Sequence, residues 1–245
     1  MRRVTLIAFG FVMLAAVTAR PGMFPPEITY RIYIYGELAG KNVVKITDEG
    51  DAVVFESHSK VEIDDFALDL RCRTVVGRSD LRPRAFSYEG LRNGMEVSGS
   101  VRFDGESVTA DHVAAGTEYS TKKNVEGKVA LFENYMIEHQ LLLLNTVARS
   151  DEPYQRFKLF FPIDFNPGSV LALLESEVEL DTTPRSVCKK YHFEIERGSA
   201  FYGYIDLKRN LVVYMDFPAT STEIFLESAF TDTPGTKYVR PAAAP

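Results

Sequence analysis

A period of two in hydrophobicity runs through most of this 245-residue chain and constrains the fold more than any other feature. The segment 28–35, for example, places Ile28, Tyr30, Ile32 and Ile34 on one side. Successive side chains of a β-strand point to opposite faces, so the pattern predicts strands with one apolar and one polar face. Such strands pair into antiparallel sheets. No segment has the pattern of the βαβ unit that is typical of nucleotide-binding folds.

Turn residues divide the alternating segments into about ten strands. Gly36 to Gly40, Glu49-Gly50-Asp51 and Lys208-Arg209-Asn210 each stand between two such segments. We find no internal repeat and no linker that would split the chain, and we therefore expect a single β-rich domain over residues 20–230. Residues 231–245 contain three prolines and few apolar residues, which is typical of a flexible C-terminal tail.

Residues 131–149 break the alternation, because their apolar residues recur at helical spacing without Gly or Pro. Leu141 to Leu144 are consecutive and point in four directions about 100° apart, so such a helix must be enclosed on most sides. The sequence therefore predicts a mainly β fold with one main helix. We expect a curved antiparallel sheet, a half-open barrel, wrapped around a long apolar helix.

The first 19 residues have the features of a secretory signal peptide. A basic start, Met1-Arg2-Arg3, precedes an apolar run over residues 4–16, and Val17-Thr18-Ala19 fits a small-residue cleavage site. A membrane-spanning helix needs roughly 20 apolar residues, so this run is too short to be one. We expect cleavage after Ala19, no transmembrane anchor in the mature chain, and a periplasmic location, with secretion as the alternative.

Export would place the two cysteines, Cys72 and Cys188, in an oxidising compartment where a disulfide is stable. However, Cys72 alternates in phase with apolar Leu68 and Leu70, whereas Cys188 alternates in phase with polar residues such as Lys190. The sequence leaves open whether the two thiols pair or stay separate.

Composition argues against nucleic acid as a partner. The chain has 28 Lys and Arg residues against 34 Asp and Glu residues, a net charge of −6, so it has no basic surplus to neutralise phosphates.

No catalytic, metal-binding or cofactor-binding motif is recognisable. The four histidines stand far apart, and the chain lacks an HExxH motif, a GxSxG elbow and a phosphate-binding glycine loop. Cys188 and His192 would lie about 13 Å apart on one strand, too far for direct proton transfer. We therefore expect a protein that is not an enzyme and carries no cofactor. The histidines are His58, His112, His139 and His192.

The order of these segments resembles that of a family of uncharacterised exported bacterial proteins. The resemblance lies in the opening hairpin around residues 30–40, in the segment 132–143, and in a late hairpin over residues 204–212. In outline, such proteins are similar to periplasmic carriers of lipoproteins, whose half-open barrels enclose an apolar cavity. The resemblance thus implies a half-barrel that binds an apolar molecule, without identifying it.

Two functions follow as hypotheses. In the first, the protein binds or carries a lipid or acyl chain in the cell envelope, inside a cavity between the sheet and the helix. In the second, it is a non-catalytic structural or assembly factor that acts through envelope proteins, and the helix fills the interior. The residues expected to line the cavity are Phe55, Leu68, Leu70, Val97, Val101, Met136 and Leu143.

Overall fold

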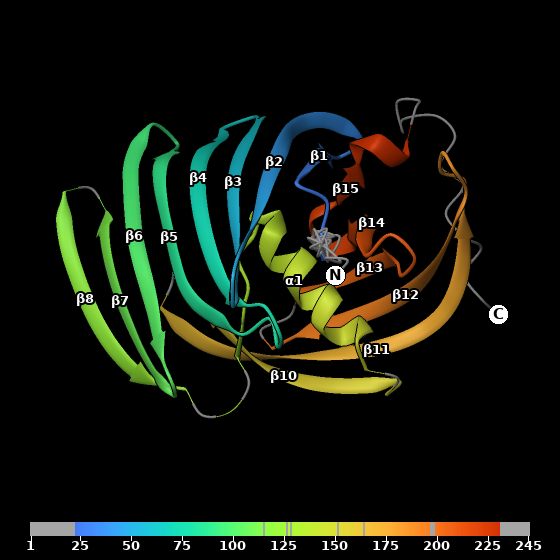
Figure 1. Cartoon of the computed structure of the whole chain (residues 1–245). Helices are drawn as coiled ribbons and strands as arrows, with labels where there is room; N and C mark the ends of the chain where they lie inside the picture. Colours follow the sequence, from blue (N-terminus) through green and yellow to red (C-terminus); the bar gives the residue numbers. More distant parts are fainter. Residues whose placement is uncertain are drawn as a thin grey trace, which may run out of the picture.

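Among the residues that the computed structural model of the chain describes, fifteen strands hydrogen-bond into one continuous curved sheet (Figure 1). The structure describes residues 23–114, 116–125, 127, 129–150, 152–163, 165–196 and 199–230, so the expected signal peptide and C-terminal tail lie outside the described residues. The strands are β1 (Glu27–Ile34), β2 (Glu37–Glu49), β3 (Ala52–Ile63), β4 (Phe66–Gly77), β5 (Pro83–Arg92), β6 (Met95–Asp104), β7 (Ser107–Ala114), β8 (Thr117–Asn124), β9 (Val129–Leu131), β10 (Tyr154–Phe161), β11 (Asn166–Leu180), β12 (Ser186–Ile195), β13 (Ser199–Asp206), β14 (Leu211–Phe217) and β15 (Thr222–Leu226). The helices are α1 (Ile137–Ala148) and two 3-10 turns, Pro218–Thr220 and Glu227–Ala229.

The sheet consists of two meanders joined along the first and the last strand. One meander runs outward from β1 to β8, the other runs back from β9 to β15, and the sheet order is β8 to β1 followed by β15 to β9. The join is the antiparallel pairing of β1 with β15, which sets Tyr30 opposite Leu226 and Ile34 opposite Thr222. The mainly β, curved, single-sheet prediction is confirmed.

The alternation of the sequence becomes an inner and an outer face of this sheet. The inner face is the one that α1 covers, and on β3 it carries buried Phe55 and Val61, whereas Glu56 and His58 point outward and are exposed. Neighbouring strands continue the same faces, because residues directly opposite each other in an antiparallel pair lie on the same side.

The sheet differs from the expectation in two respects. It has fifteen strands where the sequence indicated about ten, and β9 pairs parallel with β10, so the sheet is not wholly antiparallel. Two strands with weak patterns account for part of the first difference, and one of them, β9, accounts for the second. The strand β8 has almost no apolar residues and β9 has three residues, so neither produces a readable alternation.

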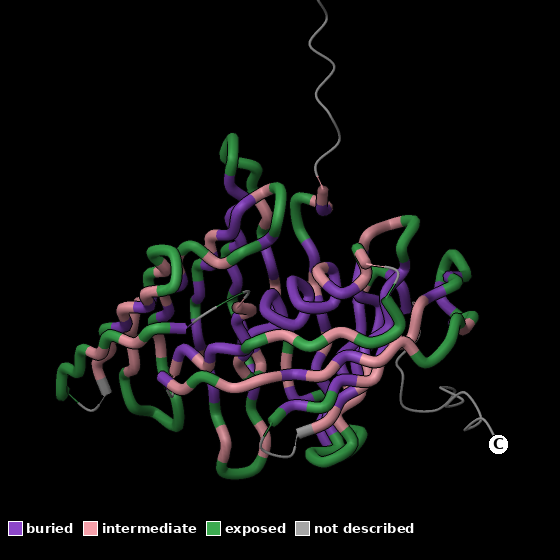
Figure 2. Tube along the Cα trace, turned by 90° about the horizontal axis from the view of Figure 1, so that it is seen from below, coloured by how far each residue is buried: buried purple, intermediate pink, exposed green. Residues whose placement is uncertain are grey.

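The helix α1 lies in the concavity of the sheet, and its trace is buried over most of its length (Figures 1 and 2). Leu141, Leu143 and Leu144 are 0% exposed and Leu142 is 7% exposed. The prediction that this leucine run is enclosed on most sides is therefore confirmed.

The expectation of a long apolar helix over residues 131–149 is wrong, because α1 has 12 residues. Leu131 instead belongs to β9 and pairs with Phe160. Tyr135 has a left-handed backbone, with φ of +63°, which no α-helix accommodates. The Glu133 carboxylate accepts a hydrogen bond from the backbone N–H of Ile163 at 2.8 Å, which fixes the preceding segment as a loop.

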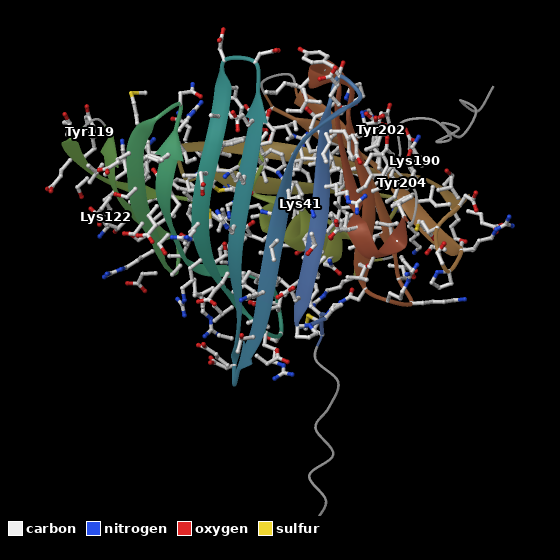
Figure 3. All side chains as sticks on the ribbon, turned by 90° about the horizontal axis from the view of Figure 1, so that it is seen from above. Lys41, Tyr119, Lys122, Lys190, Tyr202 and Tyr204 are labelled. Carbon is white, nitrogen blue, oxygen red and sulfur yellow. The ribbon has the colours of Figure 1, made fainter. Side chains whose placement is uncertain are left out.

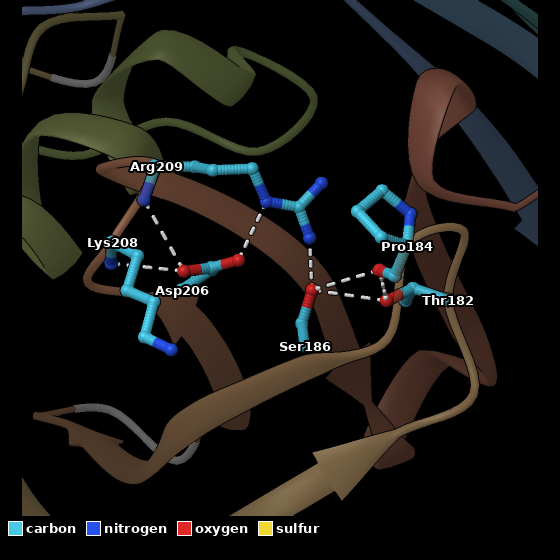
Figure 4. Close-up of polar contacts among 6 residues, drawn as sticks. All are labelled: Thr182, Pro184, Ser186, Asp206, Lys208 and Arg209. Carbon is cyan, nitrogen blue, oxygen red and sulfur yellow. Dashed lines mark hydrogen bonds and ion pairs between the residues drawn. The ribbon is translucent and has the colours of Figure 1, made fainter.

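The turn between β13 and β14 is held by a polar network (Figure 4). The Asp206 carboxylate accepts hydrogen bonds from the backbone N–H groups of Lys208 at 2.9 Å and Arg209 at 3.2 Å, and from Arg209 Nε at 2.6 Å. Arg209 also donates to Ser186 Oγ, which lies 2.9 Å from Thr182 Oγ1. This network ties the predicted hairpin to the start of β12.

A glycine of the sheet lies directly against α1. A Cβ atom on Gly203 of β13 would lie 2.4 Å from Cδ2 of Leu144, so the absence of a side chain at residue 203 lets the helix pack directly on the strand.

We expect Gly203→Ala to lower the free energy of unfolding by about 1–3 kcal/mol, because the added methyl group overlaps Leu144 in a packed core. Urea unfolding at equilibrium measures this cost. In a Leu144→Ala background the same substitution should be nearly neutral. An equal cost in both backgrounds would show that α1 does not pack on β13 in this way.

Candidate functional site

A row of polar side chains crosses the otherwise apolar inner face beneath the start of α1. The sheet contributes Asn42 from β2, Ser57 and Ser59 from β3, and Cys72 and Thr74 from β4, all of them buried. The first turn of α1 adds Glu138 and His139, which are both 0% exposed. We call this set the polar seam; its members are Asn42, Ser57, Ser59, Cys72, Thr74, Glu138 and His139.

Part of the polar seam is hydrogen-bonded. Asn42 Nδ2 donates to Ser59 Oγ at 2.6 Å, and Ser59 Oγ donates to the backbone oxygen of Tyr135 just before the helix. His139 Nε2 lies 3.5 Å from Thr74 Oγ1, and its ring meets the ring of Phe86 edge-on at 4.9 Å. These contacts attach the beginning of α1 to strands β2 to β5.

The rest of the polar seam lacks regular hydrogen bonds. Both carboxyl oxygens of Glu138, Ser57 Oγ, His139 Nδ1 and Asn42 Oδ1 are buried and make no regular hydrogen bond within the described residues. Leaving a buried polar group unsatisfied costs about 1–3 kcal/mol. The interface between α1 and the sheet is thus less stable than its leucines alone would make it.

Burial also changes the protonation of the polar seam. It raises the pKa of Glu138 to about 7, which the neighbouring Ser57 hydroxyl offsets only in part, and it lowers the pKa of His139 to about 3. Burial, reinforced by the nearby Glu138, raises the pKa of the Cys72 thiol well above its usual range. At neutral pH His139 and Cys72 are uncharged, and Glu138 is near its midpoint.

The residues expected to line a cavity all face the interior, where most of them are core. Phe55, Leu70, Val101, Met136 and Leu143 are at most 1% exposed. Leu68 is also buried, and Val97 is partly buried against the core.

The space beside the C-terminal half of α1 is small. It is lined by Val76, Leu131, Leu142, Leu143 and Phe157, among others, and its volume is about 30 Å³. That is room for about one water molecule, whereas pockets for organic ligands typically measure hundreds of Å³. Here α1 occupies the room that an acyl chain would need.

A larger hollow, of about 700 Å³, lies on the outer face of β2 to β5. It is open to solvent and is bordered by charged side chains such as Lys45, Arg71, Arg73 and Glu89. Charged side chains border this outer hollow, unlike the cavity that the sequence predicted.

The two cysteines are both free and buried, so the structure does not show the disulfide considered from the sequence. Cys72 is on β4 and Cys188 is on β12, and six strands (β3, β2, β1, β15, β14 and β13) lie between them in the sheet. A disulfide needs a Cα separation of about 4–7 Å. Burial, together with the charge of Asp206, raises the pKa of Cys188 to about 12, which makes a reactive thiol there unfavourable.

The four histidines have separate surroundings. His58 contacts Asp69 on the outer face at 2.7 Å, His112 stacks between Tyr119 and Phe165, and His192 stacks on Tyr202. Within the described ranges, no three His, Cys, Asp or Glu side chains are grouped closely enough to hold a metal ion. Nor do the described residues include a helix long and apolar enough to span a membrane.

Sequence reasoning missed the polar seam as a site, although part of its signal was present. Ser57 and Ser59 alternate in phase with Phe55 and Val61, which marks small polar side chains on a buried face. Glu138 and His139 precede the leucine run by one residue, Gln140, and the full enclosure of the helix implied their burial as well.

We expect Glu138→Gln to stabilise the protein at alkaline pH and to leave its stability nearly unchanged in acid. The folded state holds the Glu138 proton up to about pH 7, above the ordinary value of 4.5, so this group favours folding below pH 4.5 and loses that effect as pH rises through 7. At pH 8 the variant should therefore exceed the parent by up to about 3 kcal/mol in free energy of unfolding.

Urea unfolding of the parent and of Glu138→Gln at pH 4.5 and pH 8 measures this difference. His139 is present in both proteins, so its contribution cancels in the comparison. The matched control is Glu152→Gln, which changes an exposed carboxylate and should have little effect at either pH. A destabilising Glu138→Gln at pH 8 would mean that the carboxylate has a partner in the folded protein.

Comparison with known proteins supports the expectation that the chain belongs to an uncharacterised family. A family model described as "Protein of unknown function (DUF3108)" matches residues 29–225, which covers the sheet from β1 to β15 together with α1. Comparison with curated proteins and with solved structures gave no significant match. The chain therefore belongs to the DUF3108 family of proteins of unknown function.

Proposed function

We propose that this protein binds a lipid or another molecule with an acyl chain on the inner face of its sheet, and that α1 is a plug which the ligand displaces. The observation that carries the proposal is the polar seam, in which buried polar atoms of Glu138 and His139 on α1 make no regular hydrogen bond to the described residues. A helix that only completed a core would gain stability from apolar side chains at these positions.

The helix has few sources of stability apart from its buried apolar side chains and the hydrogen bonds that Gln140 and Gln155 make at its two ends. It has 12 residues, its N-cap residue Met136 makes no side-chain hydrogen bond, and its last turn has no basic residue. Isolated helices of this length are marginal in water. The position of α1 therefore depends largely on burial of apolar side chains such as Leu141, Leu143 and Leu144, and an acyl chain can replace that buried surface with its own.

The inner face offers what an amphipathic ligand requires. Phe55, Leu70, Phe86 and Val101 provide apolar surface, and the polar seam runs beside them. Its hydroxyl and amide groups, on Asn42, Ser57, Ser59 and Thr74, suit an uncharged or weakly charged head group that donates or accepts hydrogen bonds.

Two expectations from the sequence support this function. The signal peptide implies export, and the outline similarity to periplasmic carriers of lipoproteins implies an apolar ligand of the cell envelope. The proposal assigns no catalytic residue, metal or cofactor.

The alternative is a non-catalytic assembly factor of the envelope that acts through protein partners. The observations that favour it are the filled interior and the large outer hollow of about 700 Å³, which is accessible without movement of α1. The two functions differ in whether α1 must move.

A reversible cross-link tests whether α1 must move. Because Leu144 contacts the position where a Gly203 side chain would be, the variant Leu144→Cys/Gly203→Cys brings two thiols within disulfide reach. In a background with Cys72→Ala and Cys188→Ala, we expect the reduced protein to bind a fluorescent long-chain fatty acid and the oxidised protein to bind it at least about 10-fold more weakly.

The control is Ser98→Cys/Val113→Cys in the same background, since these directly opposite residues on β6 and β7 can be linked without restraining α1. Its oxidised and reduced forms should bind equally. Equal binding by both forms of the α1 cross-link would contradict the plug, and absence of binding by every form would contradict the lipid-binding function.

A further inference from the structure

The two edges of the sheet differ in length and in protection. The edge strand β9 has three residues and contacts both α1 and β5. The other edge strand, β8, has eight residues and pairs with β7 along its whole length. The opposite side of β8 has no neighbouring strand among the described residues, so a row of backbone N–H and C=O groups is unpaired there.

The exposed edge of β8 lacks most of the usual protection. Its register with β7 is continuous from Thr117 to Asn124 without a bulge, and the strand contains no proline. Natural edge strands are commonly protected by lysines, and β8 has Lys122 and Lys123. A lysine no longer prevents pairing when the approaching strand sets a carboxylate opposite it, because the two charges then attract each other.

The faces of β8 follow from the register. Phe86 contacts His139 of α1 and is therefore on the inner face, and Phe86, Val101, Ala110 and Thr121 are directly opposite one another across β5 to β8. Tyr119 and Thr121 thus belong to the inner face. Glu118, Ser120 and Lys122 belong to the outer face, and Figure 3 shows Lys122 and Tyr119 at this end of the sheet.

We propose that β8 pairs antiparallel with β8 of a second copy, about a two-fold axis that passes between the two Ser120 residues. In this register Glu118 of each copy lies opposite Lys122 of the other on the outer face, and Tyr119 lies opposite Thr121 on the inner face. Two ion pairs and two aromatic–β-branched pairs form across the axis, and both kinds stabilise antiparallel strands. The two sheets become one continuous sheet.

Charge selects this register among those that a two-fold axis allows. An axis at Thr121 would set Ser120 opposite Lys122, and an axis at Lys122 or Glu118 would set like charges opposite each other. Within one copy Glu118 and Lys122 are about 13 Å apart along the strand, so they cannot pair with each other. Neither makes an ion pair within the described part of the chain.

The edge is already ordered on its inner side. Tyr119, which is 51% exposed, stacks on His112 at 4.8 Å between ring centroids, and His112 stacks on Phe165 at 4.4 Å. Lys123 donates to the backbone oxygen of Phe165. These contacts hold β8 in place before a second copy binds, which lowers the entropy cost of pairing.

Charge exchange at the two-fold axis provides the test. Sedimentation velocity of the mature chain over a range of concentrations should show a monomer–dimer equilibrium. Glu118→Lys or Lys122→Glu alone sets like charges opposite each other twice and should raise the dimer dissociation constant at least about 10-fold. The double variant Glu118→Lys/Lys122→Glu should dimerise like the parent, and an equimolar mixture of the two single variants should form a heterodimer.

The control is Arg102→Glu, a charge reversal on the outer face of β6 that should leave the dimer unchanged. As a second measurement, Ser120→Cys should form a disulfide between copies on oxidation, whereas Ser98→Cys should not. A parent protein that stays monomeric at every soluble concentration would overturn the proposal. A dimer whose dissociation constant neither single variant raises would also overturn it. The same holds if Arg102→Glu weakens the dimer as much as the single variants do, or if a monomeric protein binds a strand of another protein along β8.

Discussion

The pairing of β1 with β15 is the constraint on which the rest of the structure depends. It joins residues nearly 200 positions apart and converts two separate meanders into one sheet with a single concavity. Side chains reinforce the join: Tyr30 Oη donates to the backbone oxygen of Val212 at 3.0 Å, and Glu227 accepts from Arg31 Nε at 2.8 Å. Without it, neither half of the sheet would enclose α1.

Enclosure of α1 creates a conflict between packing and polarity. The concavity buries the leucines, which stabilises the helix, but it also buries Glu138 and His139 without full hydrogen bonding. A fold under selection for stability alone would remove such groups, whereas a binding site uses them. Much of this conflict lies at the interface that the proposed ligand would open, although Tyr33 and His112 of the sheet also bury a polar atom without a regular hydrogen bond to the described part of the chain.

The strands were predictable because each half-buried strand repeats a two-residue pattern, as β3 does with Phe55 and Val61 facing inward. The position of the helix was predictable, but its length was not. The left-handed backbone at Tyr135 ends the possible helix on its N-terminal side, and a tyrosine does not signal that conformation in a sequence. The edge strand β8 was missed since its side chains are mostly exposed. The polar seam depends on which strands lie beneath the helix, and local patterns do not encode that three-dimensional register.

Hydrogen exchange of the α1 amides, measured with and without a long-chain fatty acid, tests the displaceable plug most directly. The account predicts that residues 137–148 exchange through local opening, at least about 2 kcal/mol below the opening free energy of β3 to β5, and that fatty acid accelerates their exchange further. Slow exchange of α1 together with the sheet, unchanged or strengthened by fatty acid, would contradict the account.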